Sequence, residues 1–153
     1  MRCEIRVAAA DDVAVIASRA RGADVAEMRA LGTTVREALD DGLKRSDWAL
    51  TGLIDGEPVC MFGVAPVSIL NGEGAPWMLG TEQLEQAQVA FLRACRGVVA
   101  DMERTYPRLM NVVDARNTVA IRWLRWLGFR FDESQYQIGG HAFKVFRKGA
   151  WHV

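Results

Sequence analysis

The chain has 153 residues, the length of one ordinary domain, and we expect residues 1–153 to form a single domain. Lys and Arg together number 19, as do Asp and Glu, so no overall charge draws the protein toward nucleic acid or acidic membranes. Cys3, Cys60 and Cys95 lie far apart without a Cys-x-x-Cys pair. This spacing predicts buried thiols in a reducing compartment and argues against a metal site or a disulfide framework.

Charged residues interrupt the apolar residues at the N-terminus, and no stretch approaches the roughly 20 consecutive apolar residues of a membrane span. We therefore expect neither a signal peptide nor a membrane span.

Alternation of apolar and charged residues over Cys3–Val7 predicts a first strand with one buried face. A helix is expected over residues 13–20, closed by Gly22, and a second helical region runs from 24 to about 43 with a break near Gly32. On these helices we expect four charged side chains to face solvent: Arg19, Arg21, Glu27 and Arg29.

Two β-rich runs, 48–54 and 58–64, flank Asp55-Gly56-Glu57, and Asp-Gly between such runs is a strong hairpin signal. The remaining predicted elements are a central strand at 77–79, a helix from about 86 to 105, a strand at 109–113, a helix ending at Gly128, and strands at 129–138 and 143–147. This order of strands and helices predicts an α/β fold.

The last predicted helix has the clearest pattern in the chain. Its apolar or small residues recur at helical spacing, and Asn117 precedes them as a cap for unpaired backbone N–H groups. Gly128 follows the helix, because glycine readily takes the left-handed conformation that closes one.

This region resembles the C-terminal motif of the GNAT (Gcn5-related N-acetyltransferase) superfamily, through Asn117, Ala120-Ile121-Arg122 and Leu127-Gly128-Phe129. A narrower similarity, to GNAT-like internal virion proteins of short-tailed phages, is carried by Pro66-Val67-Ser68, Gly74-Ala75-Pro76-Trp77-Met78-Leu79-Gly80-Thr81, Tyr106-Pro107-Arg108-Leu109 and Asp114-Ala115-Arg116-Asn117. The resemblance implies a mixed sheet of about six to seven strands with helices on both faces. It also implies a location in the host cytoplasm and in the virion.

The resemblance implies acetyl-CoA as the cofactor if the protein is an enzyme. The positions that would hold it are Leu79, Gly80, Thr81, Glu82, Gln83 and Asn117. The usual turn, Arg or Gln, two residues, Gly, any residue, then Gly or Ala, departs here to a stretch with one permissive glycine. Glu82 and Glu85 place negative charge where a pyrophosphate would bind. The signal for a working cofactor site is therefore weak.

The catalytic signals depart from the family as well. Leu124 occupies the position at which many GNAT enzymes carry a proton-donating Tyr, and a leucine cannot donate a proton. Residues 75–79 of the predicted central strand contain no carboxylate that would act as a base. Three residues are candidates for a catalytic role, although Glu73 also suits a turn: Glu73, Asn117 and Tyr136.

Trp123 and Trp126 lie three positions apart on the predicted helix and cannot both point straight at the core. Either both line a wide core face, or Trp126 joins Arg122 and Arg125 in a protein contact, since Trp and Arg often anchor interfaces. The arginines fit a solvated face better than a nucleic-acid contact.

Two hypotheses follow. In the first, the chain is a virion or virion-assembly component that contacts other phage proteins or itself. In the second, it is an active but divergent acetyl-CoA-dependent N-acetyltransferase.

Overall fold

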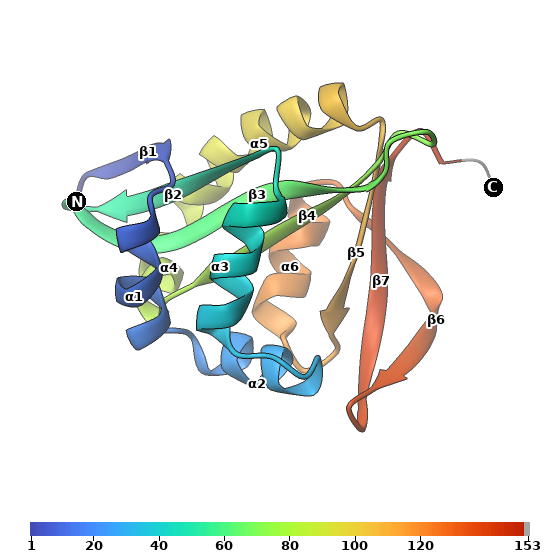
Figure 1. Ribbon diagram of the computed structural model, residues 1–153, viewed down its shortest axis with the longest axis horizontal. Coiled ribbons are helices and arrows are strands. Elements are labelled where there is room, and N and C mark those ends of the chain that lie inside the picture. The colour runs from blue at the N-terminus through green and yellow to red at the C-terminus, as the bar shows by residue number, and fades with distance from the viewer. Residues whose placement is uncertain (152–153) are drawn as a thin grey trace.

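The computed structural model describes residues 1–151 and contains one seven-stranded sheet in the order β1-β2-β3-β4-β5-β7-β6 (Figure 1). The strands are β1 Cys3–Val7, β2 Trp48–Ile54, β3 Glu57–Ser68, β4 Glu73–Gly80, β5 Arg108–Asp114, β6 Arg130–Ile138 and β7 His141–Gly149. The helices are α1 Ala10–Ser18, α2 Gly22–Ala30, α3 Val35–Arg45, α4 Glu82–Gln86, α5 Gln88–Thr105 and α6 Thr118–Trp126. Neighbouring strands are antiparallel except β4 and β5, which are parallel, so the sheet is mixed as predicted.

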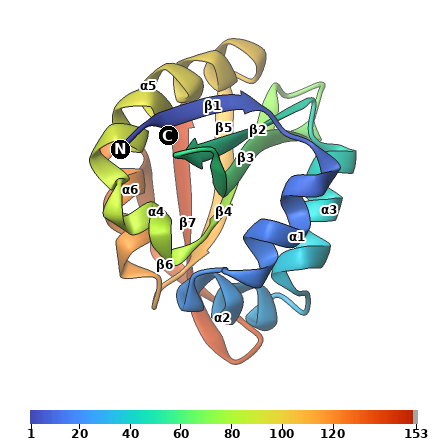
Figure 2. The same ribbon diagram turned by 90° about the vertical axis from the view of Figure 1, so that its left-hand side faces the viewer.

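Helices cover both faces of the sheet, with α1, α2 and α3 on one side and α4, α5 and α6 on the other (Figure 2). Alternate residues of one strand pack against the two helical layers, because successive side chains of a strand point to opposite faces of the sheet. Met61 of β3 packs in the cluster under α1–α3, whereas Phe62 and Val64 pack under α4–α6. In the part of the chain that the structure describes, no helix is long and apolar enough to cross a membrane.

The hairpin predicted at Asp55-Gly56 is confirmed. Asp55 and Gly56 have φ angles of 49° and 82°, as expected for a tight turn with two left-handed residues between β2 and β3. The Asn117 cap of α6 is confirmed by its side chain, which accepts a hydrogen bond from the Ala120 N–H, and Gly128 has a φ of 96°. Cys60 and Cys95 are buried thiols, whereas Cys3 is half-buried.

The early helices differ from the prediction. Gly22 opens α2, whereas the sequence pattern assigned it to close the preceding helix. The reason is tertiary, because Ala20 pairs with Thr81 and the Arg21 N–H donates to the Gly80 carbonyl, which draws the chain out of α1 toward the end of β4. The expected break near Gly32 is confirmed, and the polar connection after β4 contains the short helix α4.

The turn between β6 and β7 touches the end of α2. Gly139 has a φ of 57°, and a Cβ there would lie 2.2 Å from the Ala30 carbonyl oxygen. Gly140 also has a positive φ, 80°, but a Cβ there meets open space, so it is a matched control for backbone strain. We expect Gly139→Ala to lower the free energy of unfolding by about 1–2 kcal/mol more than Gly140→Ala, because only the first adds a steric clash. Urea unfolding of both variants measures the difference, and equal losses would contradict the close approach.

Candidate functional site

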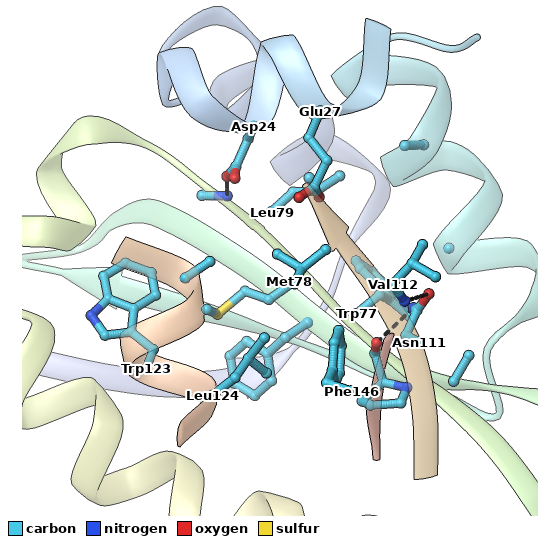
Figure 3. Close-up of a pocket in the computed structure, with 18 of the residues that line it drawn as sticks. Asp24, Glu27, Trp77, Met78, Leu79, Asn111, Val112, Trp123, Leu124 and Phe146 are labelled. Carbon is cyan, nitrogen blue, oxygen red and sulfur yellow. Dashed lines mark hydrogen bonds between the residues drawn. The ribbon is translucent and has the colours of Figure 1, made fainter. Parts of the chain in front are cut away.

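The two parallel strands of the sheet diverge soon after they meet. β4 pairs with β5 only through Glu73 with Arg108 and Gly74 with Leu109, so the rest of β4 as far as Gly80 has no partner strand on that side. A cavity of about 810 Å³ lies in this gap (Figure 3). Residues of α2 and α3 line it on one face of the sheet, and residues of α5 and α6 line it on the other. The divergence thus creates a passage through the sheet at its centre.

Near the narrow end of the gap, one side chain bridges the two strands. The Asn111 Nδ2 donates to the Pro76 carbonyl at 2.9 Å, and its Oδ1 accepts from the Val112 N–H at 2.8 Å (Figure 3). The Asn111 amide therefore replaces the backbone hydrogen bonds that a continuous ladder would make there. It satisfies groups that would otherwise lie half-buried without partners.

Farther along β4, the backbone of Met78 faces the gap. Gly80 directs both its N–H and its C=O away from β3, the Pro76 carbonyl does the same, and successive residues alternate between the two sides of a strand. The N–H and C=O of Met78 therefore point toward β5, where none of residues 1–151 pairs with them. Met78 is the position of β4 at which backbone donor and acceptor are both open to a ligand in the cavity.

At the wide end, two carboxylates from α2 accept hydrogen bonds from backbone N–H groups of the sheet. The Asp24 Oδ2 accepts from Gly80 of β4 at 2.9 Å, and the Glu27 Oε1 accepts from Asp114 of β5 at 2.8 Å. Asp24 is 3% exposed and Glu27 is 9% exposed. The solvent-facing orientation that the sequence predicted for Glu27 is therefore wrong, since α2 turns its charged side toward the sheet.

Arg21 holds this polar end together and is also buried, contrary to the prediction. Its Nη1 lies 2.9 Å from the Asp24 Oδ1, its Nη2 donates to the Asn117 Oδ1 at 3.2 Å, and its guanidinium stacks 5.0 Å from the Trp123 ring centroid. The Arg21 Nε has no hydrogen-bond partner among the described residues. A planar guanidinium suits such a site because it can hydrogen-bond in its plane and stack at the same time.

Burial sets the protonation of the two α2 carboxyls. Removal from water raises the pKa of Glu27 to about 7, with the nearby Asp24 and Asp114 acting in the same direction and the Asp114 N–H and Asn117 opposing it. Burial also raises the pKa of Asp24, against the opposing effects of Arg21, the Gly80 N–H and Asn117. A carboxyl that titrates near neutral pH in a cavity can accept a proton from a bound group.

The turn after β4 is occupied by the protein's own contacts. The Glu82 Oε1 accepts from the Gly22 N–H at 2.9 Å, and the Glu85 Oε1 lies 3.5 Å from the Arg21 Nη2. A Cβ at Gly80 would come within 2.8 Å of Leu84, so this glycine accommodates packing inside the turn. The turn therefore presents two carboxylates and no open glycine cradle. These residues do not fit the pyrophosphate of acetyl-CoA.

The other predicted site residues are dispersed. Asn117 lies in the cavity wall, bonded to Arg21 and Asp24, and Leu124 also lines the cavity. Glu73 begins β4 at the narrow end of the gap, outside the cavity lining. Tyr136 is on β6 and 53% exposed, and it does not line the cavity either. Among residues 1–151, no cluster of His, Cys, Asp or Glu is arranged to hold a metal ion.

The two tryptophans of α6 differ in exposure, because Trp123 is buried and Trp126 is exposed. Trp123 is 4% exposed and donates from its Nε1 to the Gln88 Oε1 at 2.8 Å, whereas Trp126 is 42% exposed under the guanidinium of Arg96 at 3.7 Å. The alternative in which both line the core is therefore wrong. Arg122 and Arg125 face outward on the same helix, as expected if Leu124 packs inward.

Sequence reasoning missed the polar network that closes the wide end of the gap, formed by Arg21, Asp24 and Glu27. One signal was available, because Asp24 and Glu27 lie three positions apart on one side of a predicted helix, and Arg21 lies three positions before Asp24. That signal does not distinguish a buried polar side from a solvated one.

Comparisons with known proteins identify the fold. No protein-family model and no curated protein matches the sequence. Among solved structures, the GNAT-family acetyltransferase from Streptococcus pneumoniae has a TM-score of 0.65 at 11% identity over 97% of this chain and 100% of its own. The ribosomal-protein-S5-alanine acetyltransferase from Vibrio fischeri has a TM-score of 0.68 at 14% identity over 97% and 93%. The aminoglycoside acetyltransferase AAC(6')-Ib, in a complex with coenzyme A, has a TM-score of 0.68 at 13% identity over 97% and 95%. The divergent parallel strands and their helical layers thus give this chain the fold of the GNAT acetyltransferases.

Proposed function

We propose that this chain uses the GNAT fold as a scaffold for protein contacts and does not transfer acetyl groups. The observation that supports the proposal is that side chains of this chain satisfy the backbone groups at both ends of the gap between β4 and β5. Asn111 bridges the two strands at one end. At the other end, Asp24 and Glu27 accept hydrogen bonds from backbone N–H groups of β4 and β5. A ligand lying along β4 would have to displace these contacts, and Leu124 offers no proton to a leaving group.

The proposed contact surface is the outer side of α6, defined by Trp126, Arg122 and Arg125. Trp126 exposes 42% of its surface, and Arg96 stacks on its ring, which gives the surface an ordered aromatic centre with cationic neighbours. The partners that we propose are other phage proteins or a second copy of this chain, in the host cytoplasm or the virion, as the resemblance implies.

The proposal predicts no stabilisation by acetyl-CoA. A ligand at 100 times its dissociation constant stabilises a protein by about 2.7 kcal/mol, which raises the melting temperature of a domain of this size by roughly 5–10 °C. We expect a shift below about 1 °C with millimolar acetyl-CoA at fixed salt. A GNAT enzyme of known cofactor affinity serves as the positive control. A saturable rise in a folded sample would overturn the proposal and favour the enzyme.

For the contact surface, we propose affinity capture from phage-infected cells with the wild type and Trp126→Ala. Val25 is exposed on α2, on the other side of the sheet from α6, so Val25→Ala controls for the loss of an exposed apolar side chain away from α6 (Figure 2). Partners lost with Trp126→Ala but retained with Val25→Ala support the α6 surface, and identical capture by all three proteins would contradict it.

A second candidate function is a divergent N-acetyltransferase acting on an amine. It is favoured by the open Met78 backbone in a cavity of about 810 Å³ and by the Glu27 carboxyl, whose pKa of about 7 suits proton removal from an ammonium group. Release of free thiol from acetyl-CoA in the presence of a panel of amines tests it. The reaction must disappear in Glu27→Gln if Glu27 is the base.

A further inference from the structure

The buried side of α2 is unusual for a short surface helix. Its buried residues are Asp24, Glu27 and Met28, of which only the methionine is apolar. Helices normally dock through apolar side chains, and hydrophobic burial is not easily replaced by a polar ligand. By contrast, a ligand with suitably placed acceptors can replace the hydrogen bonds that two backbone N–H groups donate to these carboxylates.

The two backbone N–H groups that donate to the α2 carboxylates both lie at the wide end of the gap. Gly80 is the last residue of β4 and Asp114 is the last residue of β5, so the bound N–H groups sit at the corresponding ends of two parallel strands, across the wide end of the gap. The carboxylates come from one helix at i and i+3, which places them on the same side of it. In this arrangement, Asp24 and Glu27 supply the acceptors that the carbonyl groups of an inserted chain would supply to a strand edge (Figure 3).

The rest of the gap remains suited to an extended chain. The Met78 N–H and C=O are open between the Asn111 bridge and the α2 carboxylates, and the surrounding wall includes Leu79, Leu124 and Phe146. An amide group of a ligand could pair with Met78 as a neighbouring strand would. The α2 carboxylates block the continuation of that ligand toward the ends of the strands.

We propose that α2 is an internal plug, in which Asp24 and Glu27 occupy the strand ends of a cleft that would otherwise take an extended ligand carrying amide carbonyls. The inference rests on the proposed function, because it explains why a fold with this cleft lacks cofactor binding. Removal of the two carboxylates, without any other change, opens the cleft.

The experiment measures binding of pantetheine to the wild type and to Asp24→Ala/Glu27→Ala by isothermal titration calorimetry. Pantetheine carries two amide carbonyls and lacks the pyrophosphate that the turn after β4 does not fit. We expect no saturable binding to the wild type and saturable binding to the double variant, with a dissociation constant at least about tenfold below the weakest one that the titration can detect. Amide hydrogen exchange at Gly80 and Asp114 should quicken in the ligand-free double variant and slow again when pantetheine is added.

Matched variants separate the plug from a general charge effect. Glu37 and Asp41 line the same cavity from α3, where Glu37 accepts a hydrogen bond from Thr33 and Asp41 pairs with Arg45. Within residues 1–151, neither carboxylate bonds to the sheet. Glu37→Ala/Asp41→Ala also removes two negative charges, and we expect no gain of binding. A gain equal to that of the α2 variant would overturn the plug. Asp24→Asn/Glu27→Gln keeps an acceptor oxygen at each position, so it should leave exchange at Gly80 slow, and rapid exchange would overturn the plug.

The outcomes distinguish this inference from the proposed function. Saturable binding of acetyl-CoA to the wild type would overturn the proposed function, and binding of pantetheine to the wild type would overturn the plug. If pantetheine binds neither the wild type nor a folded double variant, the plug alone is overturned. Removal of Asp24 also breaks its ion pair with Arg21, so Glu27→Ala is the second variant if the double variant does not fold. Glu27→Ala frees the Asp114 N–H without breaking an ion pair, and it must bind pantetheine or quicken exchange at Asp114 for the plug to stand.

Discussion

Replacing Arg21 with Ala lowers the free energy of unfolding by about 3–5 kcal/mol, because the substitution leaves buried Asp24 without its cationic partner. The same change removes the hydrogen bond to Asn117 and the stacking on Trp123. Urea unfolding followed by circular dichroism measures the loss. We expect Arg21→Lys to recover only a part of it, since a lysine ammonium cannot bond to Asp24 and Asn117 in one plane while it stacks on a ring.

Arg29 lies on α2, which begins directly after Arg21, and it faces solvent, so it is the control. Arg29→Ala should change the free energy of unfolding by no more than about 0.5 kcal/mol, as surface substitutions usually do. A loss below about 1 kcal/mol for Arg21→Ala would show that the network does not hold α2 to the sheet.

Stability should fall as the pH rises from about 4.5 to about 7, because Glu27 has a pKa of about 7 in the folded chain against 4.5 as its ordinary value. Between these values the folded state binds a proton that the unfolded state has released, so deprotonation favours unfolding. The difference corresponds to at most about 3 kcal/mol above pH 7. Asp24, whose pKa burial also raises, contributes in the same direction.

Urea unfolding at pH 5, 6, 7 and 8 tests this dependence on the wild type and on Glu27→Gln, which cannot titrate. We expect a flatter profile in the variant, and identical slopes would contradict the raised pKa. Asp12 acts in a separate range, because its hydrogen bonds with Arg6 lower its pKa to about 2. The stability that Asp12 contributes is complete above its ordinary pKa of 3.8 and is lost as the pH falls toward 2, below the range measured for Glu27.

Both predictions concern residues that sequence reasoning assigned to solvent. A charged residue on a short helix is usually exposed, and a pattern of charges at i, i+3 and i+6 does not show which side of the helix faces the protein. The bonds that bury Arg21 and Glu27 reach Asn117 and Asp114, 96 and 87 residues away along the chain. Such pairings depend on how α2 and β5 meet in space, which no local pattern encodes.

The sequence by itself determined the elements whose signals are local. Alternation marked the strands, Asp55-Gly56 specified the hairpin through two left-handed residues, and Asn117 and Gly128 marked the start and end of α6. The order of these elements was sufficient for the α/β class, and the resemblance to the GNAT superfamily implied the mixed sheet. Only the tertiary structure decided the site, because the divergence of β4 from β5 and the burial of the α2 carboxylates arise from contacts between distant segments. The physical reason is that backbone conformation follows from neighbouring residues, whereas the stability of a buried charge depends on the partners that the whole fold brings to it.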